Sequence, residues 1–276
     1  MIMASDLHIH TTASDGRLSP QEVVQLAIKN NLKYIAITDH DTLNGLLKLD
    51  EKNLLYQESI KIIRGIEFSA DMPSNEVHIL GYHIDLYYPP LKEKLKSLVD
   101  ARWNRLDNMI KKLNSLGYII KKEEVLEIAG DTTSIGRAHI ARCLVEKGYF
   151  KRLGEIFDQL LGKNCPAYEP HAKLTCEEII QLVSRAGGVS IIAHPGMIGD
   201  DKIVHHLIAL GISGIEVFHP KHSPEEVIKY MELAKKNNLF ITGGSDYHAI
   251  KTRYPEKLGM FTIDDIWAEI LDKKSC

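Results

Sequence analysis

The sequence predicts an α/β protein in which helices cover a mainly parallel β-sheet. Short apolar runs with the composition of buried strands recur along the chain, and stretches of helical periodicity separate several of them. Three helix starts are marked by capping boxes, at Ser19, Thr175 and Ser223. A strand followed by a capped helix, repeated along a chain, is typical of a parallel sheet with helices on its faces.

The elements follow one another in a regular order. Two capping boxes, Ser19–Glu22 and Ser223–Glu226, place proline at the first helical position, where no N–H donor is needed. The third box is Thr175–Glu178. The strands that we expect are Asp6–His10, Tyr34–Thr38, Ile62–Phe68, Val77–Tyr82, Val189–Ala193, Gly214–Phe218 and Leu239–Gly243.

Residues 91–170 interrupt this alternation and are helical in character. They begin with an amphipathic run from Leu91 to Leu116, which Gly117 ends. We therefore expect a body formed by residues 1–90 and 171–276, with residues 91–170 inserted as a helical cap over the active site. The insertion has 15 Lys and Arg against 11 Asp and Glu, and the remainder has 19 against 26. A basic cap on an acidic body suits a phosphate ligand, although solvated helix faces explain the individual lysines equally well.

Composition excludes several classes of protein. The 276 residues carry a net charge of −3, so no overall field favours nucleic-acid or membrane binding. No apolar run approaches the ~18 residues of a membrane span, and the N-terminus lacks the features of a signal peptide. We expect a cytoplasmic protein without an obligate protein partner. Its cysteines lack a C-x-x-C pair and are expected to be reduced thiols: Cys143, Cys165, Cys176 and Cys276.

Residues of the metal-ligand type lie at the ends of the expected strands, spread along the whole chain. A strand end places a side chain at the mouth of a parallel sheet or barrel, where such folds carry their chemistry. Imidazoles and carboxylates are ligands of Mn, Fe and Zn. The pattern indicates a hydrolase site with several metals. The candidate ligands are His8, His10, Asp15, His40, Glu67, His78, His194, Asp246 and His248.

The spacing of these residues has physical reasons. His8 and His10 are two residues apart on a strand and therefore point to one face. Asp15 lies in a polar loop in which Gly16 permits a tight turn, and a carboxylate at Glu67 can bridge two cations. A single histidine on an apolar strand is more often a hydrogen-bonded structural residue. The joint pattern at successive strand ends favours metal binding, whereas Asp39, Asp41 and Glu76 are expected to cap or solvate loops.

The chain resembles the PHP (polymerase and histidinol phosphatase) domain superfamily over essentially its whole length. Four family motifs are matched by His8-Ile9-His10, Thr38-Asp39-His40, His194-Pro195 and Asp246-Tyr247-His248. It is most similar to stand-alone members that are 3′,5′-nucleoside bisphosphate phosphatases or 5′-to-3′ oligoribonucleases. Those proteins also resemble it in the segments His10–Gly16, Thr38–Thr42 and Gly136–Arg142. The usual family form has Pro at the position of Ala138, so we expect a looser helix start there.

The resemblance implies a distorted (β/α)7 barrel of the PHP type that binds three divalent metal ions, most often Mn, with Fe or Zn as alternatives. It implies that a metal-activated water, rather than a side chain, attacks phosphorus. Carried over by motif, the ligands of the first ion are His8, His10, Glu67 and Asp246. Those of the second are Glu67, His78 and His194, and those of the third are Asp15, His40 and His248.

Basic side chains of the insertion and of later loops are candidates for binding substrate phosphate. Arg137 is the first choice, because it follows a helix-entry sequence and arginine binds phosphate with two parallel hydrogen bonds. His139 and His222 come next, with a solvated surface position equally consistent for both. Arg102 and Arg105, one turn apart on a helix, could face the site, but charges on a helix surface are the favoured interpretation. Structural or exposed positions are expected for His83, His171, His205 and His206.

Three functions are compatible with these features. The favoured one is removal of the 3′-phosphate from nucleoside 3′,5′-bisphosphates, with 5′-to-3′ hydrolysis of short oligoribonucleotides as a further activity. The first alternative is a phosphatase of another small metabolite such as histidinol phosphate. The second is a non-catalytic PHP module that acts as a scaffold. Such modules usually lack ligands, whereas all nine candidate positions are filled in this sequence.

Overall fold

The computed structural model describes residues 4–72, 75, 77–130, 132, 135–170, 174–251 and 253–273. In these residues one sheet has the order β8-β7-β6-β4-β3-β2-β1-β9, with β5 beside β3. All seven expected strands are present. The remaining two, β5 and β9, have two residues each, too few for a periodicity to predict. The strands are β1 (Ala4–Ile9), β2 (Leu32–Ile37), β3 (Lys61–Asp71), β4 (Val77–Tyr82), β5 (Leu174–Thr175), β6 (Val189–Ile192), β7 (Gly214–Phe218), β8 (Phe240–Gly243) and β9 (Ile263–Asp264).

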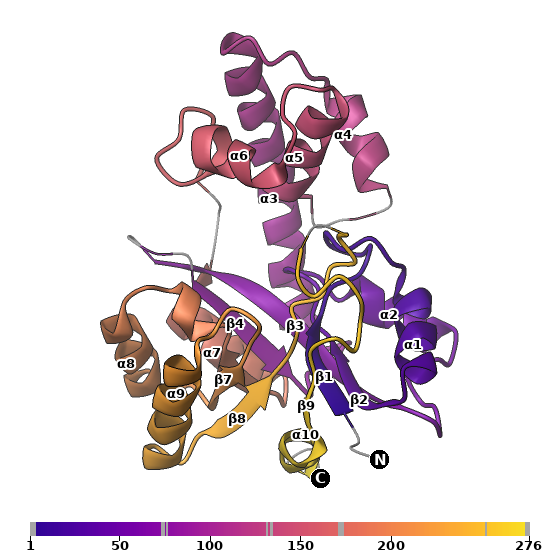
Figure 1. Cartoon of the computed structure of the whole chain (residues 1–276), viewed down its shortest axis with the longest axis vertical. Coiled ribbons are helices and arrows are strands. Elements are labelled where there is room, and N and C mark those ends of the chain that lie inside the picture. The colour runs from indigo at the N-terminus through magenta and orange to yellow at the C-terminus, as the bar shows by residue number, and fades with distance from the viewer. Residues whose placement is uncertain are drawn as a thin grey trace.

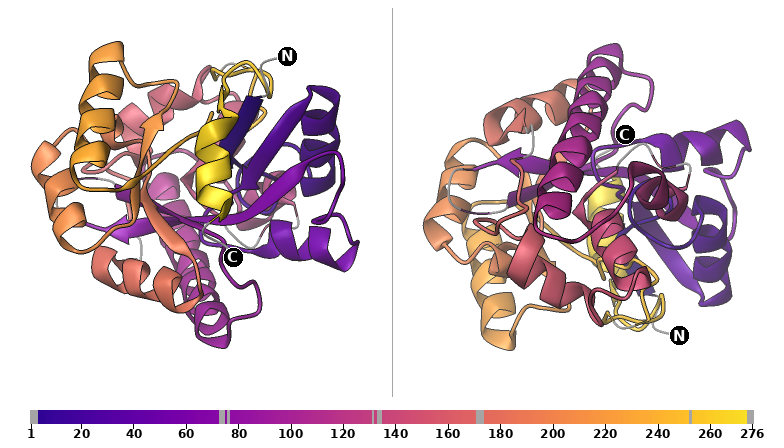
Figure 2. Two further views of the ribbon diagram at one scale, coloured as in Figure 1. Left: turned by 90° about the horizontal axis from the view of Figure 1, so that it is seen from below. Right: turned by 90° about the horizontal axis from the view of Figure 1, so that it is seen from above.

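The sheet curves into a nearly closed barrel, which confirms the predicted architecture (Figures 1 and 2). Beyond β8, Tyr247 forms a parallel bridge with Ile9 of β1. The His10 amide donates to the Tyr247 carbonyl at 2.9 Å, and the Tyr247 amide donates to the His8 carbonyl at 3.3 Å. These bonds bring β1, the last strand but one in this order, beside the loop after β8 at its other end.

Most neighbouring strands are parallel, but β4 runs antiparallel to both β3 and β6. The amino end of β4 therefore lies at the same edge of the barrel as the carboxyl ends of β1, β2 and β3. His78 is the second residue of β4 and reaches that edge for this reason. Side chains alternate across a strand, so Leu80 and Tyr82 follow His78 on the inward face. Both are completely buried.

Helices surround the barrel and close one end of it. The last helix, α10 (Asp265–Asp272), lies across the end opposite the predicted ligands, and Ala268 and Leu271 pack into the interior cluster (Figure 2). The predicted capping boxes at Ser19, Thr175 and Ser223 are all present. The outer helices are α1 (Pro20–Lys29), α2 (Asn44–Glu51), α7 (Cys176–Arg185), α8 (Asp201–Ala209) and α9 (Pro224–Lys236).

The insertion forms a helical unit above the open end of the barrel (Figure 1). The first half of α3 packs on the body, because Leu91, Leu95 and Leu98 belong to the body's apolar cluster. A separate cluster, which includes Leu113 and Leu144, is formed within the insertion. We therefore propose that residues 1–90 and 171–276 form the body and that residues 91–170 form the insertion. The insertion contains all but the first two residues of α3 (Pro89–Ser115), together with α4 (Lys122–Ala129), α5 (Arg137–Glu146), α6 (Leu153–Ile156) and a π-helical turn (Phe157–Leu161).

Arg102 and Arg105 are buried, so the expectation of surface charge was wrong. Arg102 forms an ion pair with Asp41 and donates to the Ile135 carbonyl at 3.3 Å. Arg105 donates from Nε to the Glu169 carbonyl at 2.8 Å. The length of α3 carries these side chains from the body across to the loops of the insertion. Arg102 connects the insertion to the body, and Arg105 connects α3 to another loop of the insertion.

The structure also describes three of the four cysteines and the hydropathy of the helices. Cys143 and Cys176 are buried thiols, and Cys165 is partly buried. In the described part of the chain no helix combines the length and the apolar character that a membrane crossing requires. Three residues named above lie outside the described residues: Glu76, His171 and Cys276.

The hydroxyl of Tyr82 donates to the Leu7 carbonyl at 2.6 Å, from β4 to β1, strands that are not neighbours in the sheet. We predict that Tyr82→Phe lowers the free energy of unfolding by about 1–3 kcal/mol, because a buried acceptor loses its donor. Urea denaturation followed by circular dichroism measures this change. Tyr56→Phe is the matched control, since the Tyr56 side chain is 76% exposed. Equal stability of both variants and the wild type would contradict the prediction.

Candidate active site

The nine predicted ligands converge at the open end of the barrel, below the insertion. Glu67 lies at their centre and is 1% exposed. Its Oε2 atom is 3.4 Å from His8 Nε2, 3.2 Å from His10 Nε2 and 3.0 Å from His40 Nδ1. His8 lies on β1 and His10 directly follows that strand, and they reach Glu67 together because side chains two residues apart on extended backbone share a face, as the sequence predicted.

The other oxygen of Glu67 faces a second pair of imidazoles. Glu67 Oε1 is 2.8 Å from His78 Nδ1 and 3.0 Å from His194 Nε2. His78 comes from antiparallel β4, and His194 follows β6 with a φ of 30°. Left-handed backbone at a non-glycine residue is sparsely populated and is often found at functional sites. The two oxygens of one carboxylate thus face two different groups of imidazoles.

Asp246 and Asp15 complete the arrangement on the side of β1. Asp246 Oδ1 lies 3.3 Å from His10 Nε2 and 3.5 Å from His248 Nδ1, and its Oδ2 forms an ion pair with Arg253. Asp15 Oδ1 lies 3.2 Å from His248 Nε2. Ligand atoms gather within 4.8 Å of one another in three overlapping groups: His10, Asp15, His40 and His248; His8, His10 and Asp246; His40, Glu67 and His78.

The chemistry of these side chains fits divalent cations. Buried polar atoms are normally hydrogen-bonded, and atoms that are not need an explanation such as an ion. In the described part of the chain, the site contains buried atoms without a hydrogen-bond partner: His8 Nε2, His10 Nε2, Asp15 Oδ1, His40 Nδ1, Glu67 Oε2 and His194 Nδ1. Nitrogen and oxygen donors that converge in this way form a ligand set for Mn, Fe or Zn.

The electrostatics of the site also favour cations. Burial alone would raise the pKa of the Glu67 carboxyl, but the imidazoles around it hold that pKa well below its usual range. The same balance holds at two other carboxyl groups, whose pKa burial alone would also raise. Arg253 and His248 hold the pKa of Asp246 well below its usual range, and His248 and His40 do the same for Asp15. The three carboxylates are therefore held in their ionised form, which is the form that binds a cation.

Glu216 orients two of the imidazoles and was missed in the sequence. It is completely buried on β7. Its Oε1 is 2.9 Å from His8 Nδ1, and its Oε2 accepts from the His194 amide at 2.7 Å. A proton on His8 Nδ1 leaves Nε2 free for a cation. A glutamate inside the apolar strand Gly214–Phe218 is the sequence signal that could have identified it.

The loop that carries Asp15 is held by Asp39, which is buried and forms no part of the ligand groups. Asp39 accepts from the Thr11 amide at 2.7 Å, from the Thr11 hydroxyl at 2.8 Å and from Ser14 Oγ at 2.6 Å. The expected loop-capping role is confirmed, whereas solvation is not. Gly16 makes the predicted tight turn, since a Cβ there would lie 2.6 Å from the His10 carbonyl oxygen.

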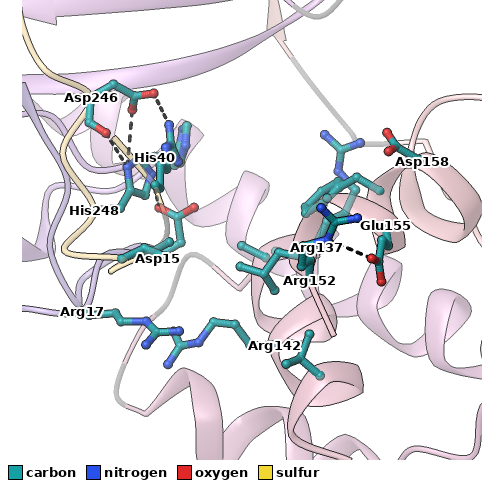
Figure 3. A pocket seen from close by; sticks show the side chains of 18 of the residues that line it. Asp15, Arg17, His40, Arg137, Arg142, Arg152, Glu155, Asp158, Asp246 and His248 are labelled. Atoms are coloured by element: carbon teal, nitrogen blue, oxygen red, sulfur yellow. Dashed lines mark hydrogen bonds and ion pairs between the residues drawn. The ribbon is translucent and has the colours of Figure 1, made fainter. Parts of the chain in front are cut away.

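A cleft of about 1100 Å³ lies between the ligand groups and the insertion (Figure 3). Its walls are rich in cations, which raises the local concentration of anionic ligands. The basic residues in its lining are Arg17, Arg102, Arg105, Arg137, Arg142, Lys151, Arg152, Lys221, Lys251 and Arg253.

Arg137 lines this cleft at the first position of α5, so the predicted helix entry is confirmed despite the absence of Pro at position 138. Its guanidinium lies over the rings of Phe157 and Tyr168, at 5.7 Å and 5.9 Å from their centroids. It also donates to the Leu161 carbonyl at 3.3 Å. These contacts hold the guanidinium at the wall of the cleft.

His139 and His222 have structural contacts and are not among the residues that line the cleft. His139 is buried, and its Nδ1 accepts from the Gly136 amide at 3.1 Å at the start of α5. His222 Nδ1 lies 2.9 Å from the Val217 carbonyl, and Nε2 accepts from the Gly196 amide at 3.1 Å. Both ring nitrogens of His222 therefore connect loops. Its neighbour Lys221 is the residue that faces the cleft.

Comparison with known proteins agrees with this geometry. Residues 6–241 match the family model of the PHP domain. The chain is 32% identical over 249 residues to a 3′,5′-nucleoside bisphosphate phosphatase of Chromobacterium violaceum, covering 88% of this chain and 87% of that protein. It is 30% identical over 248 residues to the 5′-3′ exoribonuclease Rnm of Escherichia coli, covering 88% of this chain and 84% of the relative.

Two further proteins extend the comparison. A phosphoribosyl 1,2-cyclic phosphate 1,2-diphosphodiesterase of Eggerthella lenta is 30% identical over 256 residues, with 92% of this chain and 97% of that protein covered. A solved structure from Bifidobacterium adolescentis, predicted to be a metal-dependent phosphoesterase, superposes with a TM-score of 0.89 at 30% identity, over 99% of this chain and 97% of that one. The chain therefore belongs to the PHP domain family and is a metal-dependent hydrolase of phosphate esters.

Proposed function

We propose that the enzyme removes the 3′-phosphate from nucleoside 3′,5′-bisphosphates, and that it also shortens small oligoribonucleotides from their 5′ end. The observation that carries this proposal is the cleft, which has a carboxylate and imidazole site on one wall and arginines on the other. Its volume suits a nucleotide-sized ligand. Similarity to the Chromobacterium phosphatase and to the Escherichia coli exoribonuclease supports the same substrate class.

A second candidate has support from the Eggerthella relative, which acts on a phosphoribosyl cyclic phosphate. Like a nucleoside bisphosphate, that substrate is a pentose with more than one phosphoryl position. The scaffold alternative has less support, because all nine candidate ligand positions carry ligand-type side chains. Histidinol phosphate has a single phosphate, so most of the basic side chains in the cleft lining would have no anionic group of the substrate to bind.

We propose that the nine converging residues hold three divalent ions, with Mn as the expected metal. The contacts of Glu67 support a bridging position, since Oε2 faces His8, His10 and His40 while Oε1 faces His78 and His194. When bound, such ions supply an activated water and neutralise charge on the phosphoryl oxygens. The imidazole of His248 is oriented for Asp15 because its Nδ1 lies 2.8 Å from the Asp246 carbonyl.

The protein side chains then have two tasks. Glu216 and Asp39 keep the ligands in place, as described above. Arg137 from the insertion and Lys221 from the loop after β7, which both line the cleft, bind the non-bridging oxygens of phosphate groups. Arg137 is suited to this task because stacking on Phe157 and Tyr168 fixes its plane before the substrate arrives.

The direct test is phosphate release from adenosine 3′,5′-bisphosphate by Mn-loaded protein. We expect release of one phosphate and formation of adenosine 5′-monophosphate, with His8→Ala reducing the rate at least about 100-fold through loss of a ligand. Histidinol phosphate and phosphoribosyl 1,2-cyclic phosphate are assayed alongside. Faster turnover of either compound than of the bisphosphate would replace the proposed substrate.

Arg137 can be tested separately from the metals. We predict that Arg137→Ala lowers kcat/KM for the bisphosphate by about 10- to 100-fold, because one charge-assisted bidentate contact is lost. The manganese content, measured by mass spectrometry, should stay equal to that of the wild type. Arg185→Ala, an exposed charge in the last turn of α7, is the matched control. Loss of manganese in Arg137→Ala would show that the residue supports the fold and not the substrate.

A further inference from the structure

We propose that His219 is a positioning residue of the metal centre, which donates a hydrogen bond from Nε2 to Asp246 Oδ2 and thereby strengthens cation binding by that carboxylate. The inference rests on the proposed function only in that a cation occupies the group of His8, His10 and Asp246. It does not depend on which phosphate ester is the substrate. His219 belongs to none of the predicted ligand sets.

The dipeptide His-Pro follows two neighbouring strands of the sheet. His194-Pro195 begins two residues after the end of β6, and His219-Pro220 comes directly after β7. Because β6 and β7 are paired and parallel, both histidines lie at the same edge of the barrel. Their ring centroids are 5.4 Å apart. His219 therefore reaches the centre from the strand beside the one that supplies the ligand His194.

The imidazole of His219 has a buried N–H group that needs an acceptor. Its Nδ1 accepts from the Lys221 amide at 3.3 Å, so the ring proton lies on Nε2. Nε2 is buried and has no hydrogen-bond partner among the described residues. Asp246 Oδ2 lies 3.9 Å from it, about 1 Å more than a typical hydrogen bond. A small movement of either side chain completes the bond and removes the cost of an unsatisfied buried donor.

The two oxygens of Asp246 have different surroundings. Oδ1 lies 3.3 Å from His10 Nε2 and 3.5 Å from His248 Nδ1, on the side of the ligand groups. Oδ2 forms an ion pair with Arg253 and faces His219. A carboxylate oxygen can accept two hydrogen bonds. One from Arg253 and one from His219 therefore complete Oδ2 and leave Oδ1 for a cation.

Two other roles for His219 have less support. It is not a member of the three groups of ligand atoms, and its Nδ1 is occupied by the Lys221 amide. A direct contact with substrate is disfavoured because His219 is 3% exposed and is not among the residues that line the cleft. Partners that orient a metal-binding side chain in this way typically change metal affinity by roughly 10- to 100-fold.

The test is the Mn affinity of His219→Phe and His219→Gln, measured from the electron paramagnetic resonance signal of free Mn in titrations of chelator-treated protein. Phe keeps a ring beside His194 but loses the donor, whereas Gln keeps an N–H donor. We expect one ion to bind roughly 10- to 100-fold more weakly to the Phe variant, and the Gln variant to recover most of this loss. His205→Phe, at an exposed position of α8, is the control. Unchanged affinity for every ion in His219→Phe would overturn the proposal.

Thermal unfolding separates a positioning role from a packing role. In EDTA the His219→Phe variant should unfold close to the wild-type temperature, because an unsatisfied N–H is removed and the Lys221 amide lies at an exposed residue. Added Mn should raise the unfolding temperature less in the variant, since weaker binding to the folded state stabilises it less. A lower unfolding temperature already in EDTA, with all ions weakened equally, would show a packing role and overturn the proposal.

Activity separates positioning from a direct part in the reaction. With adenosine 3′,5′-bisphosphate, kcat of His219→Phe should approach the wild-type value at saturating Mn and fall below it when Mn is limiting. A kcat that stays low at saturating Mn would overturn the proposal, because His219 would then act on the substrate. If the wild type does not hydrolyse the bisphosphate, the proposed substrate falls, and the difference in Mn affinity still tests the role of His219.

Discussion

A single buried carboxylate, Glu67, is the group on which the rest of the site depends. Five imidazoles lie within 3.4 Å of its two oxygens, and they come from β1, β4 and the loops after β2 and β6. An ionised carboxylate at the end of a barrel is costly to bury unless positive charge or hydrogen-bond donors surround it. Glu67 therefore holds strands together in the folded chain and, in our account, holds cations together in the active enzyme.

The residues behind this centre give it a fixed shape. Glu216 connects His8 to the backbone of His194, and Asp39 holds the loop that carries Asp15. Left-handed backbone at His194 and Asp246 directs their side chains inward. Arg102 joins the insertion to Asp41, so the arginine-rich wall of the cleft is fixed relative to the ligands. A site that is organised before its ligand binds loses less free energy on binding.

Local patterns in the sequence predicted much of this arrangement. Apolar periodicity and capping residues were enough to predict the seven longer strands and the helix starts at Ser19, Thr175 and Ser223. The convergence of the nine ligand-type residues followed from strand ends meeting at one edge of a sheet. The antiparallel direction of β4 could not be predicted, because side-chain alternation is the same in both directions.

The predictions that were wrong or missing concern residues whose contacts in the folded chain are distant in the sequence. Arg102 is buried because Asp41, in another part of the fold, pairs with it, and nothing in the helical pattern of α3 indicates this contact. Glu216 depends in the same way on His8. His222 was a candidate for phosphate binding because it follows a strand, but its ring nitrogens contact Val217 and Gly196. Such contacts become visible only when the folded chain brings the loops together.

The central claim is that Glu67 bridges cations held by the surrounding imidazoles and carboxylates. The most direct measurement is the manganese content per chain of the wild type and of Glu67→Gln, determined by mass spectrometry after loading and gel filtration. Our account predicts three ions in the wild type and the loss of more than one ion in the variant, with the fold preserved by circular dichroism. Loss of one ion or none in a folded Glu67→Gln variant would contradict it.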